Sequence, residues 1–172
     1  MTVRKYFFSC ALLLFGCSGV VESSFESMAA GFALRFGVQE IRARELAEFQ
    51  PDLIVDVRTA AEQSVSVLPG SVLASPGTDL SALPQFAAAS RIVVYCAGGY
   101  RSARSISHVS PEKAAGKALL NLHGGILAYA NAGLPLVTLV GTPTRKVHGY
   151  NEAWVKFVRA PAEGVTKPDL EQ

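Results

Sequence analysis

The chain has 172 residues, of which 49% are hydrophobic and 17% are charged. This length fits one domain with terminal extensions better than two domains, and the hydrophobic share is sufficient to fill a core. A formal net charge of +2 does not supply the strongly basic surface of nucleic-acid-binding domains, so we expect no nucleic acid partner.

The N-terminal end has the layout of a secretory signal peptide. Basic residues 4–5 precede the mostly apolar residues 6–15, a run well short of the ~20 residues that a membrane-spanning helix needs. The run ends in LFGC, with Gly16 before Cys17, which resembles a bacterial lipobox. We predict a signal peptide at residues 1–16, acylation of Cys17, and a membrane-anchored protein on the periplasmic side or the cell surface. A signal peptide cut elsewhere and an uncleaved anchor are the alternatives.

The three cysteines then have different fates. Cys10 leaves with the signal peptide, Cys17 carries lipid, and Cys96 is left as the only free thiol. No intrachain disulfide is then possible, although the compartment would allow one. A lone thiol in an exported protein is a candidate reactive group.

The terminal segments are expected to lie outside the main domain. Residues 17–37 are predicted to be a lipid-anchored tether and N-terminal segment, small, polar and acidic to about Ser27 and then a short apolar helix to Phe36. Residues 142–172 are predicted to form a C-terminal extension, with a short helix at 151–158 that packs its aromatic side chains against the domain.

Between these segments, residues 38–141 alternate between strand and helix patterns. We predict strands at 40–41, 53–56, 72–74, 92–95 and 118–122, and helices at 43–49, 59–63, 80–89 with an interruption at Pro84, 102–109 and 126–131. Thr59 with Glu62 three residues later has the form of a capping box. Such alternation predicts an α/β domain with a mostly parallel five-stranded sheet and helices on both faces.

The loop that follows the strand at 92–95 carries the strongest chemical signal. It reads CAGGYRS and leads directly into a helix, so its backbone N–H groups and the helix N-terminus form an anion cradle. Thiolates are stabilised near helix N-termini and cations, and ligand sites in open α/β sheets lie at the carboxyl ends of strands. We therefore predict that Cys96 is a catalytic nucleophile rather than an inert buried thiol. The predicted active-site and substrate-binding loop is Ala97, Gly98, Gly99, Tyr100, Arg101 and Ser102.

This loop resembles the active-site loop of rhodanese-like domains. The family pattern Cys-x-x-Gly-x-Arg-Ser is matched by Cys96, Gly99, Arg101 and Ser102. Further matches follow in family order: LIVDVR at 53–58, Glu62, LPGS at 68–71, NLHGGILAY at 121–129 with Tyr129 where a Trp is usual, and AGLP at 132–135. The resemblance covers about residues 38–140 and implies a rhodanese-like fold.

The resemblance also implies an activity, that of a sulfurtransferase similar to thiosulfate sulfurtransferases. Cys96 would take sulfur from a donor such as thiosulfate, hold it as a persulfide and pass it to a thiol or cyanide, with no metal or cofactor. Arg101 would hold the loop or bind an anionic donor, and Tyr100 would screen the site or contact a partner. Ala97 replaces the Arg of thiosulfate-preferring loops, and Tyr100-Arg101 replaces the Val-Thr of mercaptopyruvate loops, so the donor stays open.

Two other functions are weighed against this one. Rhodanese-fold phosphatases, which resemble the cell-cycle tyrosine phosphatases, have five residues between Cys and Arg, whereas four lie between Cys96 and Arg101; the smaller loop favours sulfur. The alternative is a non-enzymatic binding or persulfide-relay module for a partner protein. Modules that only bind usually lack the cysteine, which is present here.

Asp56 and Arg58 are predicted to support the site. Structural pairing, with Glu62 as the suggested partner of Arg58, is favoured over catalysis. The histidines, His108, His123 and His148, are too scattered to suggest metal spacing or a catalytic triad.

Overall fold

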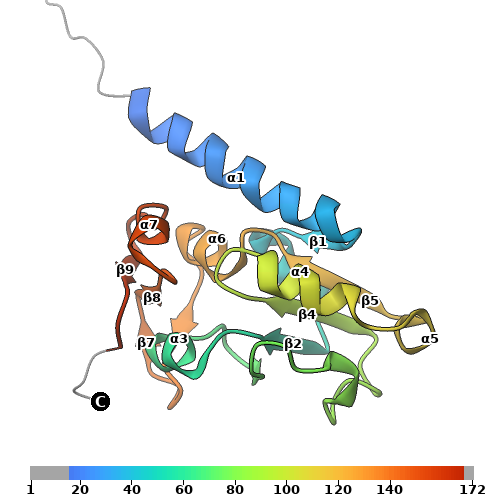
Figure 1. The fold of residues 1–172 in the computed structure, drawn as a ribbon. Helices are drawn as coiled ribbons and strands as arrows, with labels where there is room; N and C mark the ends of the chain where they lie inside the picture. Colours follow the sequence, from blue (N-terminus) through green and yellow to red (C-terminus); the bar gives the residue numbers. More distant parts are fainter. Residues whose placement is uncertain (1–15, 169–172) are drawn as a thin grey trace, which may run out of the picture.

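A five-stranded parallel sheet forms the centre of the structure, a computed structural model that describes residues 16–168, with side chains from residue 24 onward. Its strands are β1 (Gln39–Ile41), β2 (Leu53–Asp56), β3 (Val72–Leu73), β4 (Arg91–Tyr95) and β5 (Ala118–Leu122). They lie in the order β1-β5-β4-β2-β3, and every neighbouring pair is parallel (Figure 1). This confirms the predicted sheet.

Both faces of the sheet are covered, as predicted. On one face Val93 and Tyr95 of β4 pack with the helices α2 (Leu46–Phe49) and α6 (Gly125–Asn131). On the other face Ile92 and Val94 pack with α4 (Tyr100–Ser107) and the turn η2 (Leu80–Ala82). Because successive side chains of a strand point to opposite faces, the part of a central strand that is covered on both sides must be apolar, and residues 92–94 of β4 follow this rule, whereas Arg91 at its start is exposed.

Several helices are shorter than their sequence patterns suggest. The predicted helix at 80–89 is wrong: only the single turn η2 forms, and Pro84, which lacks an N–H, follows it. The predicted helix at 43–49 divides into the turn η1 (Ala43–Glu45) and α2. The predicted capping box of Thr59 and Glu62 does form, at the start of α3 (Ala60–Val65). A separate short helix, α5 (Pro111–Ala114), follows α4.

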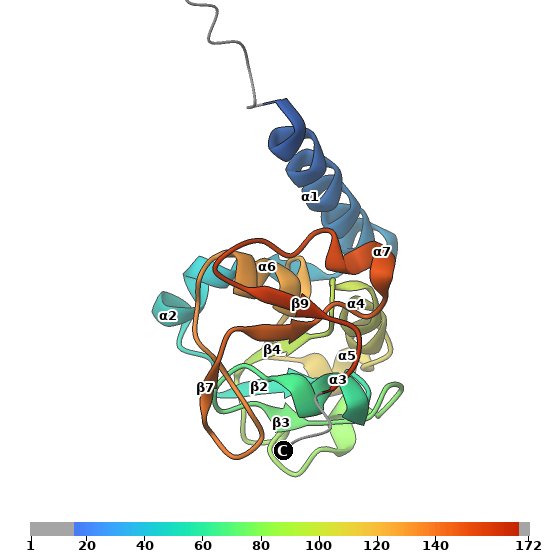
Figure 2. The same ribbon diagram turned by 90° about the vertical axis from the view of Figure 1, so that its left-hand side faces the viewer.

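The N-terminal segment differs from its prediction. One continuous helix, α1 (Gly16–Phe36), replaces the tether and short helix expected there. Its segment after residue 24 is anchored by Phe25, Ala29 and Ala33, which are buried, and this packing stabilises a helix that small polar residues would not form alone. Figures 1 and 2 show α1 lying beside α4 and α7 (Glu152–Val155), with its N-terminal end pointing away from the domain.

The export predictions depend on residues outside this description. The predicted signal peptide lies almost wholly before residue 16, and the side chain of Cys17 is not described either, so both stay predictions. Within residues 16–168, no helix combines the length and the apolar character that crossing a membrane requires.

The C-terminal extension folds back onto the domain. It contains the strands β7 (Pro143–Thr144), which pairs with β6 (Leu136–Val137), and β8 (Lys146–His148), which pairs with β9 (Glu163–Val165). The predicted helix at 151–158 is shorter than expected, because only α7 is helical. As expected, its aromatic residues Trp154 and Phe157 pack on the core.

Candidate active site

Cys96 lies directly after β4, at the carboxyl end of the sheet and ahead of α4. It is only 2% exposed, and its Sγ accepts a hydrogen bond of 3.2 Å from the N–H of Gly99. Gly99 has φ = +103°, a conformation that other residues rarely adopt, and it is the N-cap of α4. The geometry therefore turns the Gly99 N–H and the positive N-terminal end of α4 toward the sulfur.

A second helix holds the loop from the other side. At the start of α6, the N–H of Ile126 donates to the carbonyl of Cys96 at 2.9 Å, and the N–H of Leu127 donates to that of Ala97 at 3.2 Å. Gly125 makes this approach possible, since a Cβ there would lie 2.3 Å from the Cys96 carbonyl oxygen. The Gly-Gly motif after β5 thus lets the start of α6 come close enough to hydrogen-bond the carbonyl groups of the Cys96 loop.

A chain of buried polar groups begins at Cys96. The hydroxyl of Ser102 lies 3.6 Å from the Cys96 Sγ and donates to Asn121 Oδ1 at 2.6 Å. The amide nitrogen of Asn121 donates in turn to Glu40 at 3.1 Å, and Glu40 contacts His123 at 2.9 Å. Because the amide is held at both ends, Ser102 has a fixed orientation beside the sulfur. Sequence reasoning did not identify Asn121 or Glu40, and only the position of Asn121 within the family-like motif could have indicated it.

The polar chain continues from His123 to the N-terminal helix. Its Nε2 lies 2.9 Å from Glu26 of α1, and Glu26 also pairs with the exposed Arg42 at 3.1 Å. Hydrogen bonding to Glu40 raises the pKa of His123; burial opposes this, and Glu26 adds to it. A protonated His123 can donate to both carboxylates, so it links the docking of α1 to the loop region.

Arg101 is occupied by a buried carboxylate. Its Nη1 and Nη2 donate to the two oxygens of Glu62 at 2.7 and 2.6 Å, and Glu62 also accepts hydrogen bonds from Thr59. Burial alone would raise the pKa of Glu62, but the bonds from Arg101 and Thr59 lower it to about 2. The partner of Glu62 is therefore Arg101, and the suggested pairing of Arg58 with the Glu62 carboxylate is wrong.

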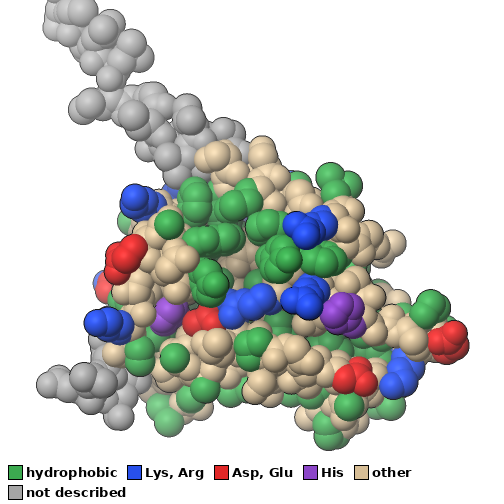
Figure 3. Space-filling model, viewed as in Figure 1, with side chains coloured by type: hydrophobic (Ala, Val, Ile, Leu, Met, Phe, Trp, Pro, Cys, Tyr) green, Lys and Arg blue, Asp and Glu red, His purple; other side chains and the backbone are tan. Residues whose placement is uncertain are grey.

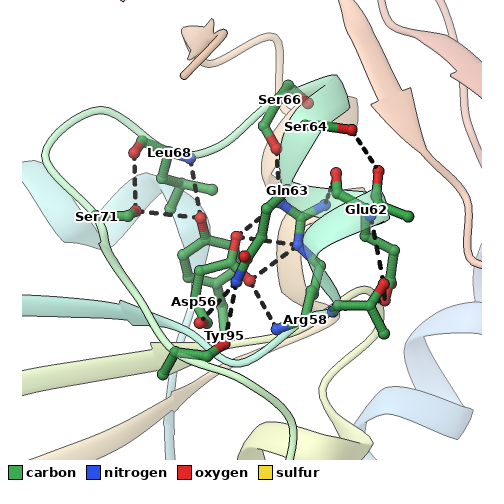
Figure 4. Close-up of polar contacts among 12 residues, drawn as sticks. Asp56, Arg58, Glu62, Gln63, Ser64, Ser66, Leu68, Ser71 and Tyr95 are labelled. Carbon is green, nitrogen blue, oxygen red and sulfur yellow. Dashed lines mark hydrogen bonds and ion pairs between the residues drawn. The ribbon is translucent and has the colours of Figure 1, made fainter. Parts of the chain in front are cut away.

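Arg58 instead binds Asp56, and both side chains are fully buried (Figure 4). The guanidinium donates to Asp56 through Nε and Nη2, the shortest contact being 2.7 Å, and to the carbonyl oxygens of Ser66 and Glu62. The groups that accept these hydrogen bonds from Arg58 are thus a buried carboxylate and two backbone carbonyl groups. The pair fixes the end of β2 and the start of the segment that carries Glu62, which is a structural role.

A pocket of about 260 Å³ opens above the sulfur. Its lining residues are Phe32, Cys96, Ala97, Gly98, Tyr100, Arg101, Tyr150 and Trp154. Phe32 comes from α1, and Tyr150 and Trp154 come from the C-terminal extension. Figure 3 views the corresponding face, where hydrophobic side chains gather beneath α1 and border basic side chains. Sequence reasoning missed these three contributors, because no local motif marks them.

Another cavity, of about 290 Å³, has three arginines, Arg42, Arg44 and Arg159, in its lining together with His123. It contains no residue of the Cys96 loop. Of these two cavities, the pocket above Cys96 is the one whose lining includes the thiol.

Comparison with known proteins agrees with this geometry. Residues 40–132, more than half of the chain, match the family model of the rhodanese-like domain. A sulfurtransferase of Allochromatium vinosum is 30% identical over 102 residues, which cover 59% of this chain and 94% of that protein. The thiosulfate sulfurtransferase of Pseudomonas aeruginosa has a similar fold, with a TM-score of 0.50 and 24% identity over 59% of this chain. The match spans only 19% of that longer chain.

Proposed function

Because this chain belongs to the family of rhodanese-like domains, we propose that it is a sulfurtransferase which carries sulfane sulfur as a persulfide on Cys96. The observation that carries the proposal is the position of the thiol. Cys96 lies at the base of a pocket, with the Gly99 N–H 3.2 Å from its sulfur and the N-terminus of α4 behind it. These groups would stabilise negative charge on the cysteine sulfur or on the outer sulfur of a persulfide.

With thiosulfate as donor, the reaction proceeds by two displacements. The Cys96 thiolate attacks the outer sulfur, the S–S bond of thiosulfate breaks, and sulfite leaves with the electron pair. A thiol or cyanide then attacks the outer sulfur of the persulfide, and the Cys96 thiolate is restored. No net oxidation of the protein occurs, and the covalent intermediate divides the transfer into two steps.

The test is intact mass measurement after incubation with thiosulfate, with Cys96→Ser as the matched variant. The wild type should gain one sulfur atom and lose it again on addition of cyanide, with release of thiocyanate. The variant should gain none. Equal mass gain in both proteins, or no loading of the wild type by any sulfane donor, would overturn the proposal.

The alternative is a persulfide relay or binding module for a partner protein. Its support is the burial of Cys96, which leaves the pocket mouth as the route to the sulfur. A relay would load sulfur in the same way but transfer it poorly to small thiols and cyanide. Slow release to small acceptors, together with rapid release to a protein thiol, would favour it.

We also propose that sulfur transfer exceeds phosphatase activity. The support is the short spacing between Cys96 and Arg101 and the engagement of Arg101 by Glu62, which leaves no unpaired guanidinium in the loop for a phosphate. Faster hydrolysis of aryl phosphates than consumption of any sulfane donor would contradict this.

We further propose that the mature protein begins at an acylated Cys17 and faces an extracytoplasmic space. The support is the signal-like sequence, together with the position of Cys17 in the first turn of α1. From Cys17 to Phe25, the first buried docking residue described, the helix rises about 12 Å, which would separate the domain from a bilayer. Membrane fractionation of the wild type beside Cys17→Ala tests this. Identical soluble behaviour with an intact Met1 would contradict it.

A further inference from the structure

The pocket above Cys96 is walled by aromatic rings. Phe32 packs edge-on against Tyr100, with ring centroids 5.4 Å apart, and Tyr150 packs edge-on against Trp154 at 6.3 Å. Trp154 also rests directly on the loop, because a Cβ at Gly98 would lie 2.0 Å from its ring. Most of the lining is therefore apolar, and it comes from three separate parts of the chain.

The pocket has one charged lining residue, Arg101, and its charge is already shared. Both terminal nitrogens of its guanidinium bind Glu62, and the guanidinium also interacts with Cys96. Its guanidinium also lies over the ring of Tyr150, at 5.2 Å from the centroid. The nearby Arg35 is stacked on Tyr100 and does not line the pocket.

These features disfavour a small dianion close to the thiol. A doubly charged donor entering an apolar pocket loses its hydration, and a guanidinium already neutralised by a carboxylate compensates for little of that loss. An apolar group attached to the sulfur gains from the same surroundings, because it buries surface against the rings.

We propose that the preferred donors of this site are organic sulfane-sulfur compounds whose transferable sulfur is attached to an aromatic or other apolar group. The proposal rests on the sulfurtransferase function above and names its substrate class. The wall formed by Phe32, Tyr100, Tyr150 and Trp154 recognises the apolar group, while the Cys96 loop receives the sulfur.

An aryl thiosulfonate is a chemically balanced example of such a donor. The Cys96 thiolate attacks the terminal sulfur, the S–S bond breaks, and the aryl sulfinate leaves with the electron pair. Reactants and products both carry two negative charges, and no outside oxidant or reductant is needed.

The test compares benzenethiosulfonate with methanethiosulfonate, which share one reacting group and one charge. The wild type should use the benzene compound with a kcat/KM at least about tenfold higher. Phe32→Ala and Trp154→Leu should each bring this ratio closer to one. Leu34→Ala is the matched control on α1, since Leu34 is 83% exposed and contributes nothing to the pocket. Tyr150→Ala supplies a further wall variant at a half-exposed position, should Trp154→Leu fold poorly.

Binding of the leaving group gives a readout that does not depend on turnover. Trp154 is the only tryptophan of the chain, so its fluorescence reports on the pocket. In Cys96→Ser, benzenesulfinate should bind at least about tenfold more tightly than methanesulfinate. Equal rates and equal binding for the two compounds, with normal loading of Cys96, would refute the donor class alone. Failure of every donor to load Cys96 would refute the proposed function, whereas the sulfinate comparison would still decide the character of the pocket.

Discussion

Replacing Arg101 by alanine should destabilise the fold as well as the loop. The substitution leaves Glu62, which is 3% exposed, without its charge partner. Removing one partner of a buried ion pair costs about 3–5 kcal/mol, and the 24% exposure of the Arg101 side chain argues for the lower end. The pKa of Glu62, lowered from 4.5 to about 2, corresponds to about 3 kcal/mol for all its hydrogen bonds and charges together, those from Thr59 included, so the share of Arg101 lies below that figure. For a chain of this size we expect the thermal midpoint to fall by about 6–12 °C.

The assay is thermal unfolding over a range of pH, with Arg104→Ala as the matched control. Arg104 is an exposed arginine of the same helix, so its loss should leave the midpoint nearly unchanged. Because the pKa of Glu62 is lowered in the folded state, the stabilisation is fully present above pH 4.5 and is lost as the pH falls toward about 2. The difference between wild type and Arg101→Ala should shrink over that interval. If Arg101→Ala instead unfolds like Arg104→Ala while sulfur loading falls more than about tenfold, Arg101 binds the donor and the clamp argument is wrong.

Three further outcomes follow from the packing. Gly125→Ala should destabilise the protein by about 1–3 kcal/mol more than Gly133→Ala in denaturant unfolding, because both glycines have positive φ but only at Gly125 would a Cβ meet loop carbonyl oxygens; equal effects would contradict this. Arg58→Met should cost about 3–5 kcal/mol, and adding Asp56→Leu should recover much of the loss, so a double variant no more stable than the single one would count against the buried pair. His123, whose pKa is raised in the folded state, should stabilise the protein most below pH 6.5 and progressively less as the pH rises; a midpoint gap between wild type and His123→Gln that grows with pH would reverse the sign.

The strands that carry the site could be predicted from the sequence, whereas their order in the sheet comes from the structure. β2, β4 and β5 are short apolar runs bounded by turn residues, and such runs are forced into the buried middle of a parallel sheet. The prediction of a helix at 80–89 was wrong because the local pattern was misleading there. The apolar spacing of this segment fits a helix, but the chain around Pro84 satisfies its backbone with turns instead.

The N-terminal helix shows how tertiary packing overrides local preference. Its sequence up to Ser27 is rich in small and polar residues, which favour loops when considered alone. In the structure Phe25 packs on Trp154 and Phe157, and this contact joins residues about 130 positions apart in the chain. No pattern within either segment could have revealed that contact.

The sequence by itself determined where Cys96 lies in the fold, because strand, glycine-rich loop and helix are consecutive and each is specified by neighbouring residues. Cys96, Gly99 and the start of α4 therefore follow from local patterns alone. Only the tertiary structure decided what surrounds the thiol. The clamp on Arg101 comes from a carboxylate 39 residues away, and the aromatic wall comes from α1 and the C-terminal extension. Such contacts depend on how elements meet in space, which is set by the burial of all apolar faces together and not by any one stretch of sequence.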